Sequence, residues 1–398
     1  MSEIANESHT AGDAVLRVTD LQMHFPVRSK GLFPKTIGQV KAVDGVSFDV
    51  QPGETLGLVG ESGCGKSTTG RTALRLLEPT SGKVEMDGID VTRMSAKDMV
   101  PLRRKAAMIF QDPYNALNPR HTVGAIIGAP FAVQGVEPAG GVRAAVRELM
   151  DRVGLNPEHY NRYPAEFSGG QRQRIGIARA VALRPHFIVC DEPVSALDVS
   201  IQAQVINLLR DLQDEFGIAY LFVAHDLAVV RQISHRVAVM YLGHVMELTS
   251  REELYSRPLH PYTHALLSAI PVPDPRAQKN REHIMLSGDL PSPVNPPSGC
   301  VFHTRCFVAQ DICKVDKPVI REFEPGHQVA CHFPITEYLG STLIVGPDPG
   351  LTPESDLEGR QDGDPMEQAG DSDLIHEPGT NYTDGTDSLI DPGPGLWR

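Results

Sequence analysis

The sequence lacks the features that would place it in a membrane by itself. No run of about 18 apolar residues occurs in the chain, so we expect no membrane-spanning helix. Residues 1–13 are polar and acidic without an apolar core, so they do not have the pattern of a secretory signal. These absences predict a cytosolic protein, or one that reaches a membrane only through partners.

A large excess of positive charge is also missing. The net charge of the 398 residues is −13, and residues 337–398 contribute 14 acidic and 2 basic side chains. The remaining 36 acidic and 35 basic side chains nearly balance, which argues against nucleic acid as the main partner. Residues 340–398 are rich in Asp, Glu, Gly and Pro, so we expect them, like residues 1–13, to be disordered.

Cysteines with C-x-x-C spacing are absent, although four of the six cysteines cluster near the end of the folded part. Cys300, Cys306, Cys313 and Cys331 are separated by five, six and seventeen residues, which excludes zinc-ribbon and bacterial ferredoxin patterns. Disulfides are not expected in a cytosolic chain. Four thiolates suit zinc or an iron–sulfur cluster. The spacing does not separate these two alternatives, nor does it exclude cysteines without metal.

The strongest positive signal is a glycine-rich stretch between an apolar run, residues 54–59, and a segment with helical spacing, residues 69–77. It consists of Gly60, Glu61, Ser62, Gly63, Cys64, Gly65, Lys66, Ser67 and Thr68. A strand, such a turn and a helix that opens with Lys-Ser form a phosphate-binding loop. Its backbone N–H groups and helix N-terminus attract an anion, Lys66 reaches the β- and γ-phosphates, and Ser67 ligates Mg²⁺. The stretch therefore predicts binding of a nucleoside triphosphate.

Apolar runs alternate with helical patterns along most of the chain, which predicts an α/β fold with a largely parallel sheet. We expect a loop over 26–40 and a turn at Asp44-Gly45. Further strands are expected at 15–21, 43–50, 83–86, 106–110, 187–190 and 219–223, a hairpin over 237–248, and helices within 115–167, 142–153, 168–183, 201–216 and 258–270.

Two further motifs carry chemistry. Asp191 and Glu192 end an apolar strand, where Asp191 would hold Mg²⁺ through its water shell and Glu192 would take a proton from the attacking water. Ser168-Gly169-Gly170-Gln171 opens a helix and predicts a second anion site, with a simple helix cap as the alternative. Two γ-phosphate sites in one chain predict a nucleotide shared with a partner, because the second site would bind the phosphate on the partner's loop.

Two cysteines lie outside the cluster. Cys64 sits in the phosphate loop at a helix N-terminus, a position that lowers a thiol pKa, so we expect alkylating reagents to block nucleotide binding through it. Cys190 lies in the apolar strand and is expected to be inert core.

Taken in order, these motifs make the chain resemble the nucleotide-binding subunits of ATP-binding-cassette (ABC) transporters over about residues 15–335. The resemblance also rests on Gln111, Ser195-Ala196-Leu197-Asp198 and His225. Within that family the chain is similar to the dipeptide and oligopeptide importer subgroup, F-type subunit. The motifs shared with the subgroup are residues 110–114, 117–120, 191–200, 260–263, 290–293 and 295–300.

The resemblance implies a P-loop NTPase cassette with a RecA-like, mostly parallel core, an antiparallel β subdomain and a helical subdomain at about 115–167. The ATPase domain would span 14–255 and a small cysteine-containing C-terminal domain 256–336. The helical subdomain would convey motion to membrane partners.

Roles follow for the matching positions. Gln111 would contact Mg²⁺ or the attacking water, His225 would orient the γ-phosphate, and Asp198 would lie beside the partner's phosphate loop. Phe25 would stack on adenine, although Pro26 replaces the family's frequent Gly and Phe33 lies in the same expected loop. Phe167 stands where many relatives have Leu and leaves Ser168 and Gly170 intact. The four clustered cysteines would hold a [4Fe–4S] cluster, with zinc as the alternative.

The implied function is an ATPase subunit of a peptide importer that uses ATP and Mg²⁺. It would pair with a different ATPase subunit and two permease subunits, and indirectly with an extracytoplasmic peptide-binding protein, on the cytoplasmic face of the cell membrane. The same machinery importing nickel or glutathione is one alternative. A soluble ABC ATPase of translation or DNA repair is another, disfavoured by the single cassette and the absence of heptads and basic excess.

Overall fold

A computed structural model describes residues 14–29, 35–270 and 283–336 of the chain. The expectations for residues 1–13 and 340–398, and for Phe33, therefore lie outside the described residues. All described residues belong to the first of the chain's two units, Met1–Val345.

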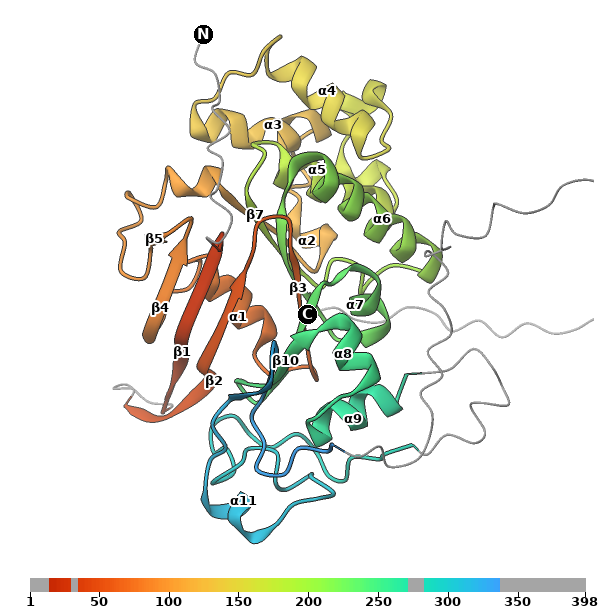
Figure 1. Cartoon of the computed structure of the whole chain (residues 1–398). Coiled ribbons are helices and arrows are strands. Elements are labelled where there is room, and N and C mark those ends of the chain that lie inside the picture. Colours follow the sequence, from red (N-terminus) through yellow and green to blue (C-terminus); the bar gives the residue numbers. More distant parts are fainter. Residues whose placement is uncertain (1–13, 30–34, 271–282, 337–398) are drawn as a thin grey trace, which may run out of the picture. The chain divides into compact units, whose positions relative to one another are not determined.

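The first unit is built on an eight-stranded sheet with the order β11-β12-β10-β9-β3-β8-β7-β6 (Figure 1). Strands β9, β3, β8, β7 and β6 are parallel to one another, whereas β10, β12 and β11 continue the sheet in antiparallel fashion. The predicted α/β fold with a largely parallel sheet is thus confirmed. The bounds are β3 Thr55–Val59, β6 Ala106–Ile109, β7 Phe187–Asp191, β8 Ala219–Ala224, β9 Arg236–Tyr241, β10 His244–Ser250, β11 Arg321–Glu324 and β12 His327–Val329.

A second, four-stranded antiparallel sheet has the order β2-β1-β4-β5. Its strands are β1 Leu16–Arg28, β2 Thr36–Val50, β4 Ser81–Met86 and β5 Ile89–Asp90. Helix α1, Lys66–Ala73, contacts strands of both sheets, and Figure 1 shows it between them. The helix that follows the glycine-rich stretch is therefore fixed on both sides.

The prediction of a loop over residues 26–40 is wrong for most of that range. β1 and β2 continue as a ribbon in which Phe25 pairs with Val40 and Pro26 with Gln39. Beyond Gln22, β1 pairs only with β2 and no longer with β4, so Pro26 lies on a strand with one free edge, where a missing N–H is tolerated.

The turn expected at Asp44-Gly45 is also wrong, because both residues lie inside β2. The pairing of β1 with β2 changes register between Leu21 and Gln22, the partners of Val46 and Asp44. Gly45, between those two partners, has φ 89°, a left-handed conformation that suits glycine at such a bulge.

The segment between β6 and β7 is helical, and Figure 1 shows α3 and α4 at one end of the unit. Asp112, Thr122 and Ser168 accept hydrogen bonds from backbone N–H groups at the starts of α2, α3 and α5, which is the usual N-cap arrangement. The bounds in this segment are α2 Pro113–Ala116, α3 Val123–Gln134, α4 Val142–Arg152, η2 Pro157–Asn161, η3 Pro164–Glu166 and α5 Gly169–Val181, with η1 Leu102–Arg104 before β6.

The remaining helices follow β7. They are α6 Val199–Phe216, α7 Leu227–Ile233, α8 Arg251–Ser256, α9 Pro261–Ser268 and α11 Asp311–Val315. In the part of the chain that the structure describes, no helix is both long and apolar enough to cross a membrane.

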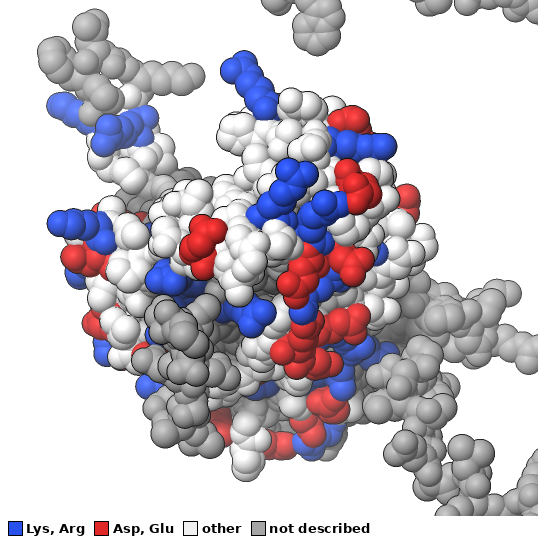
Figure 2. Space-filling model, turned by 90° about the horizontal axis from the view of Figure 1, so that it is seen from above, with Lys and Arg blue, Asp and Glu red and all other residues white. Residues whose placement is uncertain are grey.

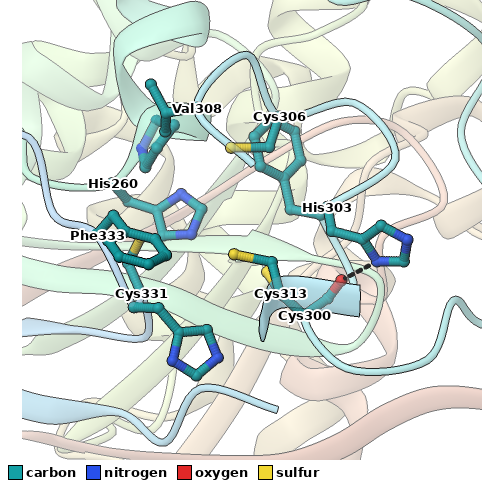
Figure 3. A pocket seen from close by; sticks show the side chains of 11 residues that line it. His260, Cys300, His303, Cys306, Val308, Cys313, Cys331 and Phe333 are labelled. Carbon is teal, nitrogen blue, oxygen red and sulfur yellow. Dashed lines mark hydrogen bonds between the residues drawn. The ribbon is translucent and has the colours of Figure 1, made fainter. Parts of the chain in front are cut away.

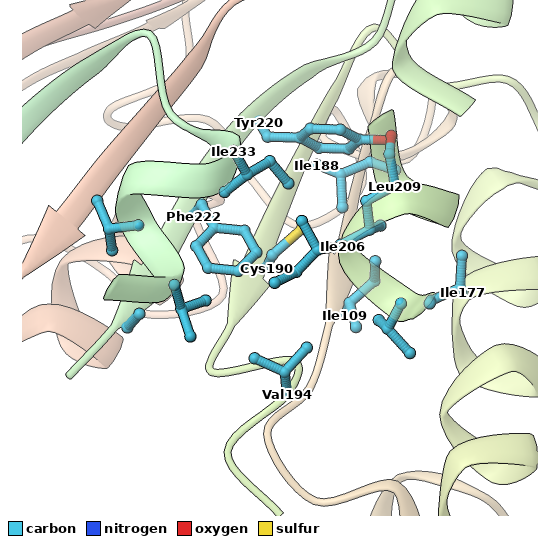
Figure 4. Close-up of a cluster of buried hydrophobic side chains, with 14 of the residues drawn as sticks. Ile109, Ile177, Ile188, Cys190, Val194, Ile206, Leu209, Tyr220, Phe222 and Ile233 are labelled. Carbon is cyan, nitrogen blue, oxygen red and sulfur yellow. The ribbon is translucent and has the colours of Figure 1, made fainter. Parts of the chain in front are cut away.

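The core lies on both faces of the large sheet. Figure 4 shows one part of it, in which Cys190 of β7 is surrounded by Ile206, Phe222 and neighbouring apolar side chains. Cys190 is fully buried, and burial raises the pKa of its thiol. Its prediction as a core residue is confirmed. The apolar core holds the carboxyl ends of β3, β7 and β8 in register, and the candidate site lies at these ends.

Candidate functional site

The glycine-rich stretch connects β3 to α1 with a backbone that other side chains could not adopt. Gly65 has φ 108°, and a Cβ there would overlap the Ala42 carbonyl oxygen. A Cβ at Gly60 would overlap the Met240 carbonyl oxygen. The loop is therefore pressed against β2 and β9 so closely that only glycine fits.

Lys66 makes hydrogen bonds to the backbone of this loop. Its side chain is buried, and Nζ donates to the carbonyl oxygens of Gly60 (2.7 Å) and Glu61 (3.0 Å). A buried ammonium group surrounded by backbone dipoles at a helix N-terminus is suited to a phosphate group. The predicted order of strand, loop and helix is present, with the lysine at the first residue of α1.

Ser67 and Asp191 meet at the end of β7. The Ser67 hydroxyl donates to Asp191 Oδ1 (2.6 Å), and Arg71 pairs with Asp191 Oδ2 (3.2 Å). Asp191 is fully buried. A hydroxyl and a carboxylate together offer the oxygen ligands that Mg²⁺ prefers, so the two residues fit a magnesium ion, whose chemistry would be to neutralise charge on the phosphates.

Gln111, Glu192 and His225 converge on one carboxylate oxygen. Gln111 Nε2 donates to Glu192 Oε2 (2.9 Å), and His225 Nδ1 lies 3.4 Å from the same atom. The three residues follow β6, β7 and β8, which are adjacent parallel strands. Glu192 has φ 45°, a strained conformation for a residue other than glycine that typically marks functional sites. The structure thus brings three predicted site residues together at one sheet edge.

Ser168 begins α5 with reciprocal caps. Its Oγ accepts from the N–H of Gln171 (3.3 Å), and the Gln171 side chain accepts from the N–H of Ser168 (3.0 Å). Both side chains are exposed, as is Asp198 at the start of α6. Within the described ranges, no hydrogen bond or ion pair joins these residues to the phosphate loop. Gly169 and Gly170 lie instead near side chains of Leu197 and Ile201.

Phe25 lies in β1 opposite Val40 of β2. Val40 is two residues before Ala42, and the carbonyl oxygen of Ala42 lies against Gly65 of the phosphate loop. Its side chain is half-buried. The pairing thus fixes the Phe25 backbone in the β1–β2 ribbon, which also contains Ala42.

The expectation that the helix N-terminus lowers the pKa of Cys64 is wrong. The side chain is 1 % exposed, and burial raises the pKa of its thiol despite the neighbouring Lys66 ammonium. The cost of placing a thiolate in an apolar environment exceeds the favourable effect of nearby positive charge.

The four clustered cysteines line a single pocket with His260, His303 and His332 (Figure 3). Cys300 and Cys313 are buried, whereas Cys306 and Cys331 are half-buried. Among residues 14–29, 35–270 and 283–336, however, no group of three or more His, Cys, Asp or Glu side chains is arranged to hold a metal ion. The cysteines share a pocket, as the sequence predicts, but the metal-ligand set expected from them is not formed in the structure.

The environment of this pocket is unfavourable for thiolates without a cation. Burial, with a smaller effect of the neighbouring thiols, raises the pKa of Cys306 to about 11 and that of Cys331 to about 12. His260 also lines the pocket and is 1 % exposed. Its Nδ1 accepts from the N–H of Tyr262 (3.0 Å), and the Ala330 backbone also interacts with the ring.

Sequence reasoning did not find two side chains that contact the phosphate loop. Arg305 Nη1 donates to both carboxylate oxygens of Glu61 (2.8 and 2.9 Å), and the Tyr262 hydroxyl accepts from the Glu61 N–H (3.0 Å). Tyr262 belongs to a motif that the sequence analysis singled out, but more than 200 residues separate it from Glu61. No local pattern could have predicted these contacts.

Charges of both signs are mixed on one face of the protein (Figure 2). On the face that Figure 2 shows, Lys and Arg side chains are interspersed with Asp and Glu. In the helical segment, for example, Arg152 pairs with Glu148 at 2.9 Å and also with Glu215.

Comparisons with known proteins agree with this geometry. Residues 43–195 match the family described as "ABC transporter", and residues 246–313 match "Oligopeptide/dipeptide transporter, C-terminal region". The chain is 57% identical over 321 residues to the oligopeptide transport ATP-binding protein AppF of Bacillus subtilis, covering 80% of this chain and 97% of that protein.

Two solved structures share the fold at 27% sequence identity. One is cbiO1 from Clostridium perfringens, part of the ABC transporter complex cbiONQ, with a TM-score of 0.53 and coverage of 62% of this chain and 92% of that one. The other is a dimeric ATP-binding cassette in a post-hydrolysis state bound to ADP and phosphate, with a TM-score of 0.52 and coverage of 59% and 98%.

Proposed function

The chain belongs to the ABC transporter family, and we propose that it is the ATP-binding and ATP-hydrolysing subunit of an importer for dipeptides and oligopeptides. The observation that carries this proposal is the convergence of Gln111, Glu192 and His225 beside the phosphate loop. The cargo follows from the match to the oligopeptide transporter C-terminal region and from the likeness to an oligopeptide transport protein.

The residues divide the work of hydrolysis. The loop, residues 60–68, and Lys66 bind the phosphates, and Ser67 with Asp191 would hold Mg²⁺, to which Gln111 is a further candidate ligand. Glu192 is the general base, since its carboxylate is fixed by Gln111 at one strand end and close to His225 at the next. His225 in turn orients the γ-phosphate. Phe25 is the proposed adenine-stacking residue, because it is an aromatic residue of the β1–β2 ribbon, in which Ala42 of β2 lies against the loop.

The nucleotide site is completed by a second ATPase subunit. Ser168, Gly169, Gly170 and Gln171 form an exposed helix start without a bond to their own phosphate loop, as an anion site for a partner's nucleotide requires. The exposed Asp198 would lie beside the partner's loop. One structural relative is described as a dimer. We propose a heterodimer with another ATPase subunit of the same importer, which closes on ATP and reopens after hydrolysis.

The helical segment at about 115–167 is proposed to contact two permease subunits and to transmit dimer closure to them. This places the protein on the cytoplasmic face of the cell membrane, with an extracytoplasmic peptide-binding protein as an indirect partner. We assign residues 14–255 to the ATPase domain and 256–336 to the C-terminal domain, whose β12 pairs with β10 of the ATPase sheet.

We further propose that the cysteine pocket holds an iron–sulfur cluster, with zinc as the alternative. Four thiols line the pocket together with three histidine side chains. A cluster contains several irons and so accepts thiolates that are further apart than the tetrahedral ligands of one zinc ion. Metal binding would require these thiols to lose their protons, and the group's contribution would be structural.

Metal analysis of protein purified without oxygen tests this assignment. We expect iron, acid-labile sulfide and broad visible absorption in the wild type, and their loss in Cys306→Ser. Cys190→Ser changes a cysteine outside the pocket and should retain all three. Stoichiometric zinc without iron would support the alternative, and metal-free protein would contradict both.

Substitution of Glu192 tests the proposed ATPase. We expect Glu192→Gln to bind ATP while its hydrolysis rate falls by about 10²- to 10⁴-fold, as is typical when a general base is removed. Glu252→Gln changes an exposed carboxylate on α8 and serves as the control. ATP hydrolysis by Glu192→Gln at the wild-type rate would contradict the assignment.

A further inference from the structure

The phosphate loop is held by two side chains that the proposed mechanism does not use. Arg305 donates to both carboxylate oxygens of Glu61, the second residue of the loop, and Tyr262 accepts from its N–H. The Arg305 side chain is 9 % exposed and that of Glu61 is 26 % exposed. Charge-assisted hydrogen bonds with two acceptor oxygens fix geometry as well as contributing energy.

Glu61 connects these side chains to the phosphate-binding lysine. Its carbonyl oxygen accepts from Lys66 Nζ (3.0 Å), so the N–H, the carbonyl group and the carboxylate of one residue are all engaged. A displacement of Glu61 therefore changes the position of the Lys66 ammonium group, which is the charge that meets the nucleotide.

Tyr262 and Arg305 are themselves rigidly supported. Tyr262 is fully buried in the first turn of α9, and its ring lies 4.9 Å from that of Tyr241 and 5.2 Å from that of Phe302. The Arg305 N–H donates to the Phe302 carbonyl oxygen (3.0 Å). Arg305 also precedes Cys306 of the cysteine pocket. The contact to the loop thus starts from a packed aromatic cluster beside that pocket.

We infer that Arg305 and Tyr262 are positioning residues that preorganise the phosphate loop for ATP, which makes the C-terminal segment part of the nucleotide site. The inference rests on the proposed ATPase function. A loop fixed before binding loses less conformational freedom when the ligand arrives, so affinity rises. The effect acts through Glu61 and Lys66, because Arg305 itself need not touch the nucleotide.

The test combines Arg305→Ala, Glu61→Gln and the double variant, with ATP affinity, KM and kcat measured on the full-length protein. We expect each single change to weaken ATP binding by about 5- to 30-fold, in the lower part of the range typical of coupled sites, and to raise KM with little change in kcat. The double variant should be no weaker than either single one, since both remove the same contact. Arg305→Lys should recover part of the affinity, and Tyr262→Phe should show a smaller loss.

Arg257→Ala is the matched control. Arg257 belongs to the same C-terminal segment and pairs with Glu253 and Glu324 in an exposed position, so its loss should leave ATP affinity unchanged. If Arg305→Ala does not fold, Glu61→Gln provides the same measurement with Arg305 in place.

Wild-type affinity in Arg305→Ala, or losses that add in the double variant, would overturn the inference while leaving the proposed ATPase intact. An equal loss in Arg257→Ala would also overturn it, because the effect would then be general. Failure of the wild-type protein to bind ATP would instead contradict the proposed function.

Discussion

The phosphate loop and the cysteine pocket both depend on small side chains, but they are built in opposite ways. The loop, residues 60–68, is one continuous segment between β3 and α1, and its shape follows from its own glycines. The pocket collects Cys300, Cys306, Cys313 and Cys331 from a segment in which only α11, β11 and β12 are regular. A continuous site can be predicted residue by residue, whereas an assembled site depends on contacts that fix its separate parts.

The phosphate loop and the cysteine pocket nevertheless share one structural feature, a glycine with positive φ packed against a carbonyl oxygen. Gly65 in the loop and Gly299 beside Cys300 both have positive φ, 108° and 64°, and both lie against a carbonyl oxygen. For Gly65 the oxygen belongs to Ala42, and for Gly299 it belongs to Cys313, which also accepts from the Cys300 N–H (2.8 Å). Gly65 thus allows the loop to pack against β2, and Gly299 allows the pocket segment to pack against α11.

Alanine at these two glycines is the change with the largest expected effect. We expect Gly65→Ala to abolish measurable ATP binding, because the methyl group would displace the loop from β2. Gly299→Ala should destabilise the C-terminal segment and weaken ATP binding less, since it acts on the loop only through Arg305 and Tyr262. Thermal unfolding and ATP binding, measured on both variants, separate the two outcomes.

Gly53→Ala and Gly326→Ala are the matched controls. Their φ values are 68° and 74°, but a Cβ there would have no neighbour within 4 Å. Each variant should therefore lose only about 1–2 kcal/mol of the free energy of unfolding, which is the cost of a left-handed conformation for a residue other than glycine. If Gly299→Ala abolished ATP binding as completely as Gly65→Ala, the distinction between a self-contained loop and an assembled segment would fail.

The pH dependence of the free energy of unfolding should show an effect of intermediate size. It tests His244, which lies where β2 and the C-terminal domain meet. His244 begins β10, where it faces Asp44, Lys41 and Lys317 of the C-terminal segment. Burial first, and then Lys317, lowers the pKa of His244 to about 4, whereas an unfolded histidine titrates near its usual value of 6.5. The Asp44 pKa is lowered as well, so this carboxylate stays ionised above pH 4.

The unfolded state therefore binds more protons than the folded state between pH 4 and 6.5. The free energy of unfolding should be unaffected by His244 above pH 6.5 and should fall by up to about 3 kcal/mol as the pH is lowered to 4, at roughly 1.4 kcal/mol per pKa unit. His244→Asn should remove this part of the pH dependence in urea unfolding between these limits. His121→Asn, at an exposed histidine, should leave it in place.

The sequence predicted the phosphate loop, the acidic pair and the parallel sheet because each depends on residues that are neighbours in the chain. It predicted a loop at 26–40 because Pro26, Gly31, Pro34 and Gly38 are typical of loops, but strand pairing with β1 decides the structure of that ribbon. The contacts of Arg305 and Tyr262 with Glu61 span more than 200 residues and arise only from tertiary packing. The error at Cys64 has the same origin, since burial is a property of the folded unit.

Alkylation of Cys64 has the smallest expected effect of the three predictions. It compares the cysteine of the phosphate loop directly with the cysteines of the pocket. The thiolate is the reactive form of cysteine, and burial raises the pKa of Cys64. At pH 7, N-ethylmaleimide should therefore modify Cys64 more slowly than it modifies free cysteine. The rate of Cys64 modification should increase as the pH is raised. Peptide mapping by mass spectrometry measures each cysteine separately. The half-buried Cys306 and Cys331, whose thiol pKa values are raised to about 11 and 12, should likewise react slowly at pH 7 in metal-free protein.

Once modified, Cys64 should carry an adduct inside the loop that prevents ATP binding, and bound ATP should slow the modification. Cys64→Ser provides the control, because reagent should then leave its ATP binding unaffected. Unchanged ATPase activity after complete modification of Cys64 would show that the loop tolerates the adduct. Rapid modification at pH 7 would show that the loop opens more readily than its buried contacts to β2 and β9 indicate, and it would reduce the contrast with the assembled pocket.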